Sequence, residues 1–167
     1  QTWWFIPFYI VYCMFWGGAD AIWHECGHRT AFKTRKLNDF FYHIASFMNN
    51  FEPVRWRWSH SLHHSYTASV DPHDYEADGS IFSKYTLLSF VINFIPGIGF
   101  FTIHKSLYIE IIKHALGIKT DVMKDCIPQD KIQDCINSSR IFVFLWISII
   151  ASSIYFSSLL PILLFLV

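Results

Sequence analysis

The sequence predicts an all-α integral membrane protein, because it combines long uncharged apolar runs with a low content of charge. Of the 167 residues, 53% are hydrophobic, 19% are aromatic and only 16% are charged. The mean hydropathy of +0.29 is high for a soluble domain. A helix needs about 20 apolar residues to cross a bilayer. We therefore expect transmembrane helices with cytoplasmic helical extensions, and no linker divides residues 1–167 into two domains.

The charge balance and the cysteines narrow the classes further. Thirteen basic residues balance thirteen acidic ones, so bulk charge suggests no nucleic-acid partner. The four cysteines form neither a secreted disulfide framework nor a C-x-x-C pair, which favours reduced, small apolar side chains. The opening run lacks the basic flank and cleavage site of a signal peptide. The chain starts at Gln1 and stops at Val167 inside an uncharged run, so we expect a fragment.

Residues 2–23 are the first expected membrane crossing, since Asp20 is the only charge among them. Trp3 and Trp4 at one end and Trp23 near the other are typical of interfacial aromatic belts. Asp20 precedes His24 by one helical turn. It could therefore accept a hydrogen bond from a metal-binding imidazole, or it could be an ordinary interfacial charge.

The stretch at 40–51 is apolar but too short to cross, so we expect an interfacial helix. Residues 24–28, before this stretch, and residues 60–64, after it, then lie on the same side of the membrane. The basic residues between them indicate the cytoplasmic side. His43 is isolated and fits a surface or packing role better than a ligand role. Trp56 and Trp58 flank Arg57, an alternation that could stack on bases but suits anchoring at the lipid interface better.

The second half alternates polar and apolar stretches. Residues 65–80 are polar and acidic and predict a surface loop that includes His73. Residues 85–103 are long enough to span, but a Pro-Gly interruption and the following lysines favour a bent segment that returns to the cytoplasmic face. The last run, 141–167, has no charge and predicts a transmembrane hairpin, with Pro161 at the start of the return helix.

Residues 104–140 predict an amphipathic cytoplasmic stretch. Ile109, Ile112 and Leu116 mark one helical face, and Gly117 is a plausible helix stop. We expect His104 and His114 on its polar or interfacial side.

Two histidine clusters carry the chemical signal, His24-Glu25-Cys26-Gly27-His28 and His60-Ser61-Leu62-His63-His64. Helical positions three and four apart share one face, so each cluster presents its imidazoles together. Imidazole is the commonest ligand for first-row transition metals. A core has little use for such clusters, because every buried imidazole needs a polar partner. The candidate metal ligands are His24, His28, His60, His63 and His64.

Zinc, copper and iron all remain open at this point. Structural zinc sites often include cysteine, but Cys26 points away from the face that His24 and His28 share. The first cluster also satisfies the H-E-x-x-H pattern of zinc proteases, with Glu25 in the position of the general base. The second cluster argues against a protease, which needs one further ligand rather than three imidazoles.

Together the two clusters, HECGH near the end of a span and HSLHH within WRWSHSLHHSYT, resemble the membrane-bound fatty acid desaturase family. The resemblance extends over essentially the whole chain. It implies that the five histidines bind a cytoplasmic di-iron centre that uses dioxygen to introduce a double bond into a fatty acyl chain. It also implies an external electron-donor protein, a cytochrome or a ferredoxin, and a location in the endoplasmic reticulum or a bacterial inner membrane.

One departure from the family pattern concerns a third box of the H-x-x-H-H type, which this sequence lacks. We expect that box beyond Val167, and we expect the present fragment to be inactive alone. Two alternatives stay open. An alkyl or lipid hydroxylase would use the same ligands, and a non-catalytic membrane protein could keep a metal for structure only.

Overall fold

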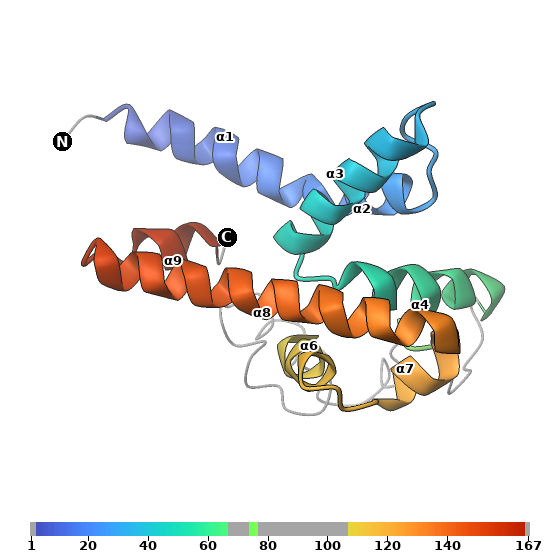
Figure 1. The fold of residues 1–167 in the computed structure, drawn as a ribbon. Coiled ribbons are helices and arrows are strands. Elements are labelled where there is room, and N and C mark those ends of the chain that lie inside the picture. The colour runs from blue at the N-terminus through green and yellow to red at the C-terminus, as the bar shows by residue number, and fades with distance from the viewer. Residues whose placement is uncertain (1–2, 67–73, 77–106, 166–167) are drawn as a thin grey trace, which may run out of the picture.

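The computed structural model describes residues 3–66, 74–76 and 107–165, and all regular elements in these ranges are helices (Figure 1). The expected bent segment at 85–103, His73 and His104 lie outside the described residues. The elements are α1 (Phe5–Gly17), α2 (Ala19–Gly27), α3 (Arg35–Met48), α4 (Pro53–Tyr66), α6 (Leu107–Ala115), α7 (Asp121–Cys126), the 3-10 turn η2 (Gln129–Lys131), α8 (Ile132–Tyr155) and α9 (Leu160–Phe165).

Two helical stretches are long and apolar enough to cross a membrane. The first joins α1 and α2 from Phe5 to Gly27, and the second joins η2 and α8 from Gln129 to Tyr155. None of the side chains of α1 is buried within the chain. Exposed apolar helices of this length fit a lipid environment, so the prediction of an all-α protein with membrane-spanning helices is confirmed.

Helix α3 has an inverted amphipathic pattern. Its buried face carries Asn38, Tyr42 and Ser46, whereas the large apolar side chains Phe40 and Ile44 are exposed. In a soluble protein the apolar face of a helix points to the core. The inversion supports the expectation that this segment lies against lipid, although the helix begins at Arg35 and so extends beyond the predicted range.

The C-terminal run forms the predicted hairpin. Helix α8 ends at Tyr155, Ser157 adopts a positive φ of 47° in the turn, and Pro161 lies in the first turn of α9. Helix α9 folds back along α8 (Figure 1). The Tyr12 hydroxyl of α1 donates to the carbonyl of Leu164, which joins the first candidate span to α9.

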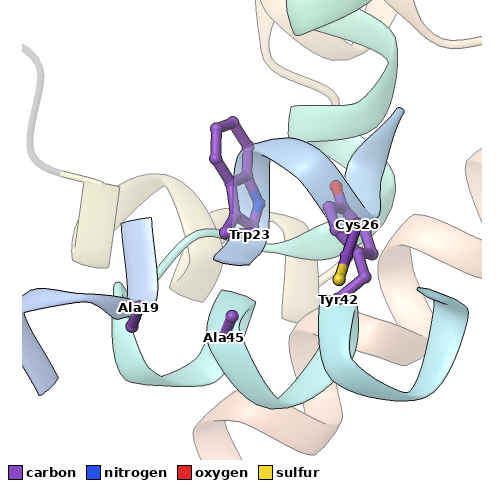
Figure 2. Close-up of a cluster of buried hydrophobic side chains, with 5 residues drawn as sticks. All are labelled: Ala19, Trp23, Cys26, Tyr42 and Ala45. Atoms are coloured by element: carbon purple, nitrogen blue, oxygen red, sulfur yellow. The ribbon is translucent and has the colours of Figure 1, made fainter. Parts of the chain in front are cut away.

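The core nearest the histidines lies between α2 and α3 (Figure 2). Its buried side chains are Ala19, Trp23, Cys26, Tyr42 and Ala45. Cys26 is buried here, away from the histidine face, as predicted. The prediction that Trp23 anchors at the lipid interface was wrong, because its ring packs against Tyr42 at 6.2 Å between centroids.

Helix α4 begins with a buried carboxylate cap. Glu52 precedes Pro53, and its two carboxylate oxygens accept the backbone N–H groups of Val54 at 3.0 Å and Arg55 at 2.6 Å. Such caps satisfy N–H groups that have no partner inside the helix. The prediction that Trp56 anchors in lipid was wrong, since its ring stacks on Phe51 at 4.3 Å. The start of α4 is therefore fixed inside the fold.

Helix α6 ends where the sequence predicts, because Gly117 has a φ of 80°. Its buried residues, however, are Ile111 and His114. Ile112 and Leu116 are exposed, so the predicted apolar face does not face the core. His114 was also misplaced by the prediction: it is fully buried, and its Nε2 lies 2.7 Å from the Thr120 hydroxyl.

Candidate metal centre

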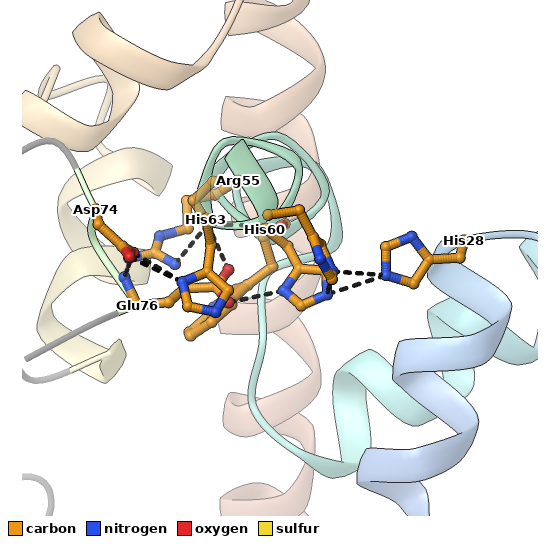
Figure 3. A network of polar contacts seen from close by, with 9 residues as sticks. His28, Arg55, His60, His63, Asp74 and Glu76 are labelled. Carbon is orange, nitrogen blue, oxygen red and sulfur yellow. Dashed lines mark hydrogen bonds and ion pairs between the residues drawn. The ribbon is translucent and has the colours of Figure 1, made fainter. Parts of the chain in front are cut away.

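Helices α2 and α4 bring four histidines together. One nitrogen of each of His24, His28, His60 and His64 lies within 4.8 Å of the others. The i, i+4 spacing puts each pair on one face of its helix, and the two faces meet (Figure 3). Four of the five candidate ligands therefore lie together in the structure.

Three of these rings point the same nitrogen at a common centre. The Nε2 atoms of His28, His60 and His64 are 3.1 to 3.2 Å apart in every pairing. A hydrogen bond between two imidazole nitrogens needs one donor and one acceptor, so three mutual contacts cannot all be satisfied by neutral rings. Nitrogens bound to one metal at about 2.0–2.1 Å would lie at about this separation. The arrangement therefore suits a cation.

His60 is oriented from behind by a carboxylate. Its Nδ1 lies 2.7 Å from Glu76 Oε2, and the two side chains are only 13% and 12% exposed. An imidazole that donates Nδ1–H to a carboxylate presents the lone pair of Nε2. Glu76 thus holds His60 in the tautomer that can bind a metal.

His63 lies beside the cluster rather than in it. Its ring centroid is 6.0 Å from those of both His60 and His64. Its Nδ1 lies 2.9 Å from Asp74 Oδ2, and Asp74 is 5% exposed. The backbone N–H of Glu76 also donates to Asp74, so one short segment supplies both carboxylates.

The prediction that residues 65–80 form a surface loop needs correction in its described parts. Residues 65 and 66 belong to α4, and Asp74 and Glu76 lie against the histidines. Of the two roles considered for Asp20, the structure favours an ordinary interfacial charge, because its side chain is exposed and the described contacts of the site do not include it. The acidic residues after the second cluster were the available signal, because ligating histidines usually need such acceptors.

His24 completes the group from α2. Its Nδ1 lies 3.1 Å from Glu25 Oε1, and Glu25 also accepts the Thr30 hydroxyl at 2.6 Å. The Glu25 side chain is 56% exposed and turned to Thr30. That position does not favour the role of general base that a protease would require.

The surroundings of His28 and His64 favour the neutral form of these two imidazoles. Burial lowers the pKa of His28, and the neighbouring His24, His60 and His64 lower it further. Burial and the adjacent His60 also lower the pKa of His64. Since a metal binds the unprotonated ring, these shifts make both side chains ready to bind at neutral pH.

A small cavity adjoins the histidines, bounded by Trp23, Tyr42, Trp56 and Arg57. Its volume is about 20 Å³, room for about one water molecule. Trp23 contacts His60 at 5.1 Å between ring centroids. Aromatic side chains thus limit the access of water to one side of the site. His43 and His114 lie elsewhere and have no part in this cluster.

Comparison with known proteins supports the same interpretation as the geometry of the histidine site. The family model described as fatty acid desaturase matches residues 1–167, the whole chain. The chain belongs to the fatty acid desaturase family. A protein named "Fatty acid desaturase" from Bacillus subtilis (strain 168) is 30% identical over 50 residues, which are 30% of this chain and 14% of that protein. No solved structure matches.

Membership of the desaturase family confirms the resemblance drawn from HECGH and HSLHH. The matched stretch covers a small part of the Bacillus relative, so activity, substrate and partners are argued as proposals below. The four converging imidazoles and two carboxylates are the geometry on which those proposals depend.

Proposed function

We propose that this chain forms part of an integral-membrane desaturase that introduces a double bond into a fatty acyl chain with dioxygen. The observation that carries the proposal is the convergence of His24, His28, His60 and His64 within 4.8 Å, in a chain of the desaturase family. We propose a single domain over residues 1–167, with the histidines on the cytoplasmic side.

The metal proposed here is a pair of irons, with His24, His28, His60, His63 and His64 as ligands. The donor set fits, because a neutral imidazole offers a lone pair to a metal, and the pKa values of His28 and His64 are lowered. Bound iron with dioxygen supplies the oxidant that breaks strong C–H bonds, which no side chain can do. Five imidazoles are few for two irons, so we propose further ligands outside this set.

The chain's own residues orient the ligands and exclude water. Glu76 and Asp74 hold the Nδ1 protons of His60 and His63, which turns each Nε2 away from its carboxylate. Trp23 and Trp56 cover the inner side of the site. Two electrons per turnover must come from a donor protein, a cytochrome or a ferredoxin, because nothing in the sequence resembles a flavin or haem site.

An apolar cleft lies on the other side of α3, lined by Trp16, Phe40, Phe47, Phe142 and Leu145 among others. Its volume is about 790 Å³, within the usual range of ligand pockets. These aromatic and aliphatic walls suit an acyl chain, which supports a lipid substrate.

Purification of the complete protein with iron, followed by mass spectrometry of the lipid product, tests the proposal. A desaturase product has lost two hydrogens, whereas a hydroxylase product has gained one oxygen. Oxygen consumption should depend on added reductant. Stoichiometric zinc with no oxygen consumption would instead indicate a structural metal site and contradict the proposal.

The ligand role of His63 is tested separately with His63→Ala. We expect loss of iron loading and of activity with unchanged membrane insertion, because the substitution removes an imidazole but no apolar contact of the spans. Metal analysis of the membrane-extracted protein gives the readout. Full iron content and wild-type turnover in this variant would exclude His63 as a ligand.

A further inference from the structure

A continuous series of polar contacts runs from Arg55, in the first turn of α4, to the histidine site (Figure 3). Arg55 Nη1 donates to Ser59 Oγ at 3.0 Å. The Ser59 hydroxyl donates to Glu76 Oε1 at 3.2 Å. The other oxygen of Glu76 accepts from His60 Nδ1 at 2.7 Å. Each group uses a donor or acceptor that its chemistry provides.

Helix geometry explains why α4 supplies residues at both ends of this series of polar contacts. Arg55 and Ser59 are four residues apart and share one face, and His60 and His64 share the adjacent face. One face therefore turns toward Glu76 and the other toward α2. Ser59 precedes His60 directly, so its hydroxyl meets the same carboxylate that the His60 ring meets.

Arg55 is a costly group to bury, and its surroundings compensate for its charge. The Arg55 side chain is 5% exposed, and its Nε lies 3.0 Å from Glu110 Oε2. Its guanidinium stacks over the Trp56 ring at 4.2 Å. A buried charge without a partner is strongly destabilising, but a buried pair by itself adds little stability. A role beyond stability would account for the two further contacts of Arg55.

Resting on the proposed metal site, we propose that Arg55 and Ser59 are positioning residues that fix the carboxylate of Glu76 and, through it, the His60 ring. Ser59 and His60 hold the two oxygens of Glu76 in one orientation. The His60 Nδ1–H then stays directed at Glu76, and Nε2 stays aimed at His28 and His64. Arg55 keeps the Ser59 hydroxyl turned toward Glu76, and Glu110 keeps Arg55 in place.

Co²⁺ binding to the complete, metal-free protein tests this relay of Arg55, Ser59 and Glu76. Loss of a group that orients a ligand typically costs 10–100-fold in metal affinity, so we expect Ser59→Ala to weaken Co²⁺ binding about tenfold. Ser59→Thr, which keeps the hydroxyl, should restore the affinity. Ser65→Ala is the matched control, because Ser65 is an exposed serine of α4 whose hydroxyl, among the described residues, donates to the Ser61 carbonyl of the same helix.

Arg55→Lys separates the geometry of Arg55 from its charge. A lysine retains the charge beside Glu110, but its single nitrogen cannot also reach Ser59 as the guanidinium does. We expect a loss similar to that of Ser59→Ala. In a Glu76→Gln background, Ser59→Ala should add no further loss, because both changes act through one carboxylate.

The thermal midpoint of the metal-free protein separates positioning from simple structural support. Positioning predicts weaker Co²⁺ binding by Ser59→Ala with an unchanged midpoint. Unchanged Co²⁺ affinity in Ser59→Ala, or losses that add in the double variant, would overturn the relay while leaving the metal site intact. A wild-type protein that binds no Co²⁺ would overturn the proposed function and the relay together.

Discussion

The carboxylates of Asp74 and Glu76 fix which ring nitrogen of His63 and of His60 can bind a metal. Each accepts a hydrogen bond from the Nδ1–H of one imidazole, and both are largely shielded from water. The sequence identified the histidines as candidate metal ligands because helical spacing fixes which side chains share a face. It showed that acidic residues follow the second cluster but not that Asp74 and Glu76 would be the partners, because their contacts with α4 depend on the tertiary path of the chain.

Asp74→Asn tests this orienting role at one residue. An amide can still accept one hydrogen bond but lacks the charge that stabilises the donating imidazole. We expect iron affinity to fall 10–100-fold, measured by competition with a chelator of known affinity. Asp121→Asn is the control, since Asp121 is 81% exposed and pairs with Lys124. Equal affinity in the two variants would show that Asp74 does not support a ligand.

His114 gives a second residue-scale prediction, which concerns pH. Burial and then the nearby Arg55 and Lys113 lower its pKa to about 4, against about 6.5 in an unfolded chain. The unfolded state therefore takes up a proton first as the pH falls. Stability that is complete above pH 6.5 should decline toward pH 4, by about 3 kcal/mol for this group.

The variant His114→Gln isolates that contribution. Burial also raises the pKa of Glu52, which acts in the opposite direction, but this effect is shared by both proteins and cancels in their difference. Thermal unfolding at several pH values should show that stability falls less steeply below pH 6.5 in His114→Gln than in the unmodified protein. An equal loss of stability with falling pH in the two proteins would contradict the lowered pKa of His114.

At the scale of elements, helix ends were easier to predict than helix faces. Gly117 and Pro161 were correctly expected to stop and to start helices, because each acts through its own backbone. The buried face of α6 was predicted wrongly, because His114 is inside and Leu116 outside. A polar residue can be buried when its partners lie outside its own helix, here Thr120 before α7 and Cys135 of α8, and the periodicity of one helix contains no such information.

Gly117→Ala tests the stop of α6. The φ of 80° is strained for a residue with a Cβ, and no atom of the described residues lies within 4 Å of the position that this Cβ would take. The cost should therefore come from the backbone alone, about 1 kcal/mol. Thermal unfolding should show a lower midpoint for Gly117→Ala. Gly17→Ala should cause no loss, because Gly17 is helical and equally open.

At the scale of the whole molecule, the two candidate spans run in opposite directions. The start of α1 and the turn between α8 and α9 lie at one end of the molecule, and α4 and α7 lie toward the other (Figure 1). The prediction of membrane helices succeeded because length and apolarity are properties of a continuous segment. Trp23 and Trp56 were misplaced because tryptophan suits both a core and an interface.

This arrangement predicts which connections face each side of the membrane. Lys119 lies in the exposed connection between α6 and α7, and Ser157 lies in the exposed turn after α8. Helix α8, with η2, is long enough to separate them by one bilayer. We therefore expect Lys119→Cys on the cytoplasmic side together with the histidines, and Ser157→Cys on the opposite side.

Labelling of sealed, right-side-out vesicles with a membrane-impermeant maleimide measures this. Ser157→Cys should react at once, and Lys119→Cys only after the vesicles are opened with detergent. The unmodified protein is the background, because its cysteines are buried or half-buried. Reaction of both positions before opening would place both connections on the same side. That result would contradict a crossing by α8 and, with it, the membrane orientation proposed for the metal site.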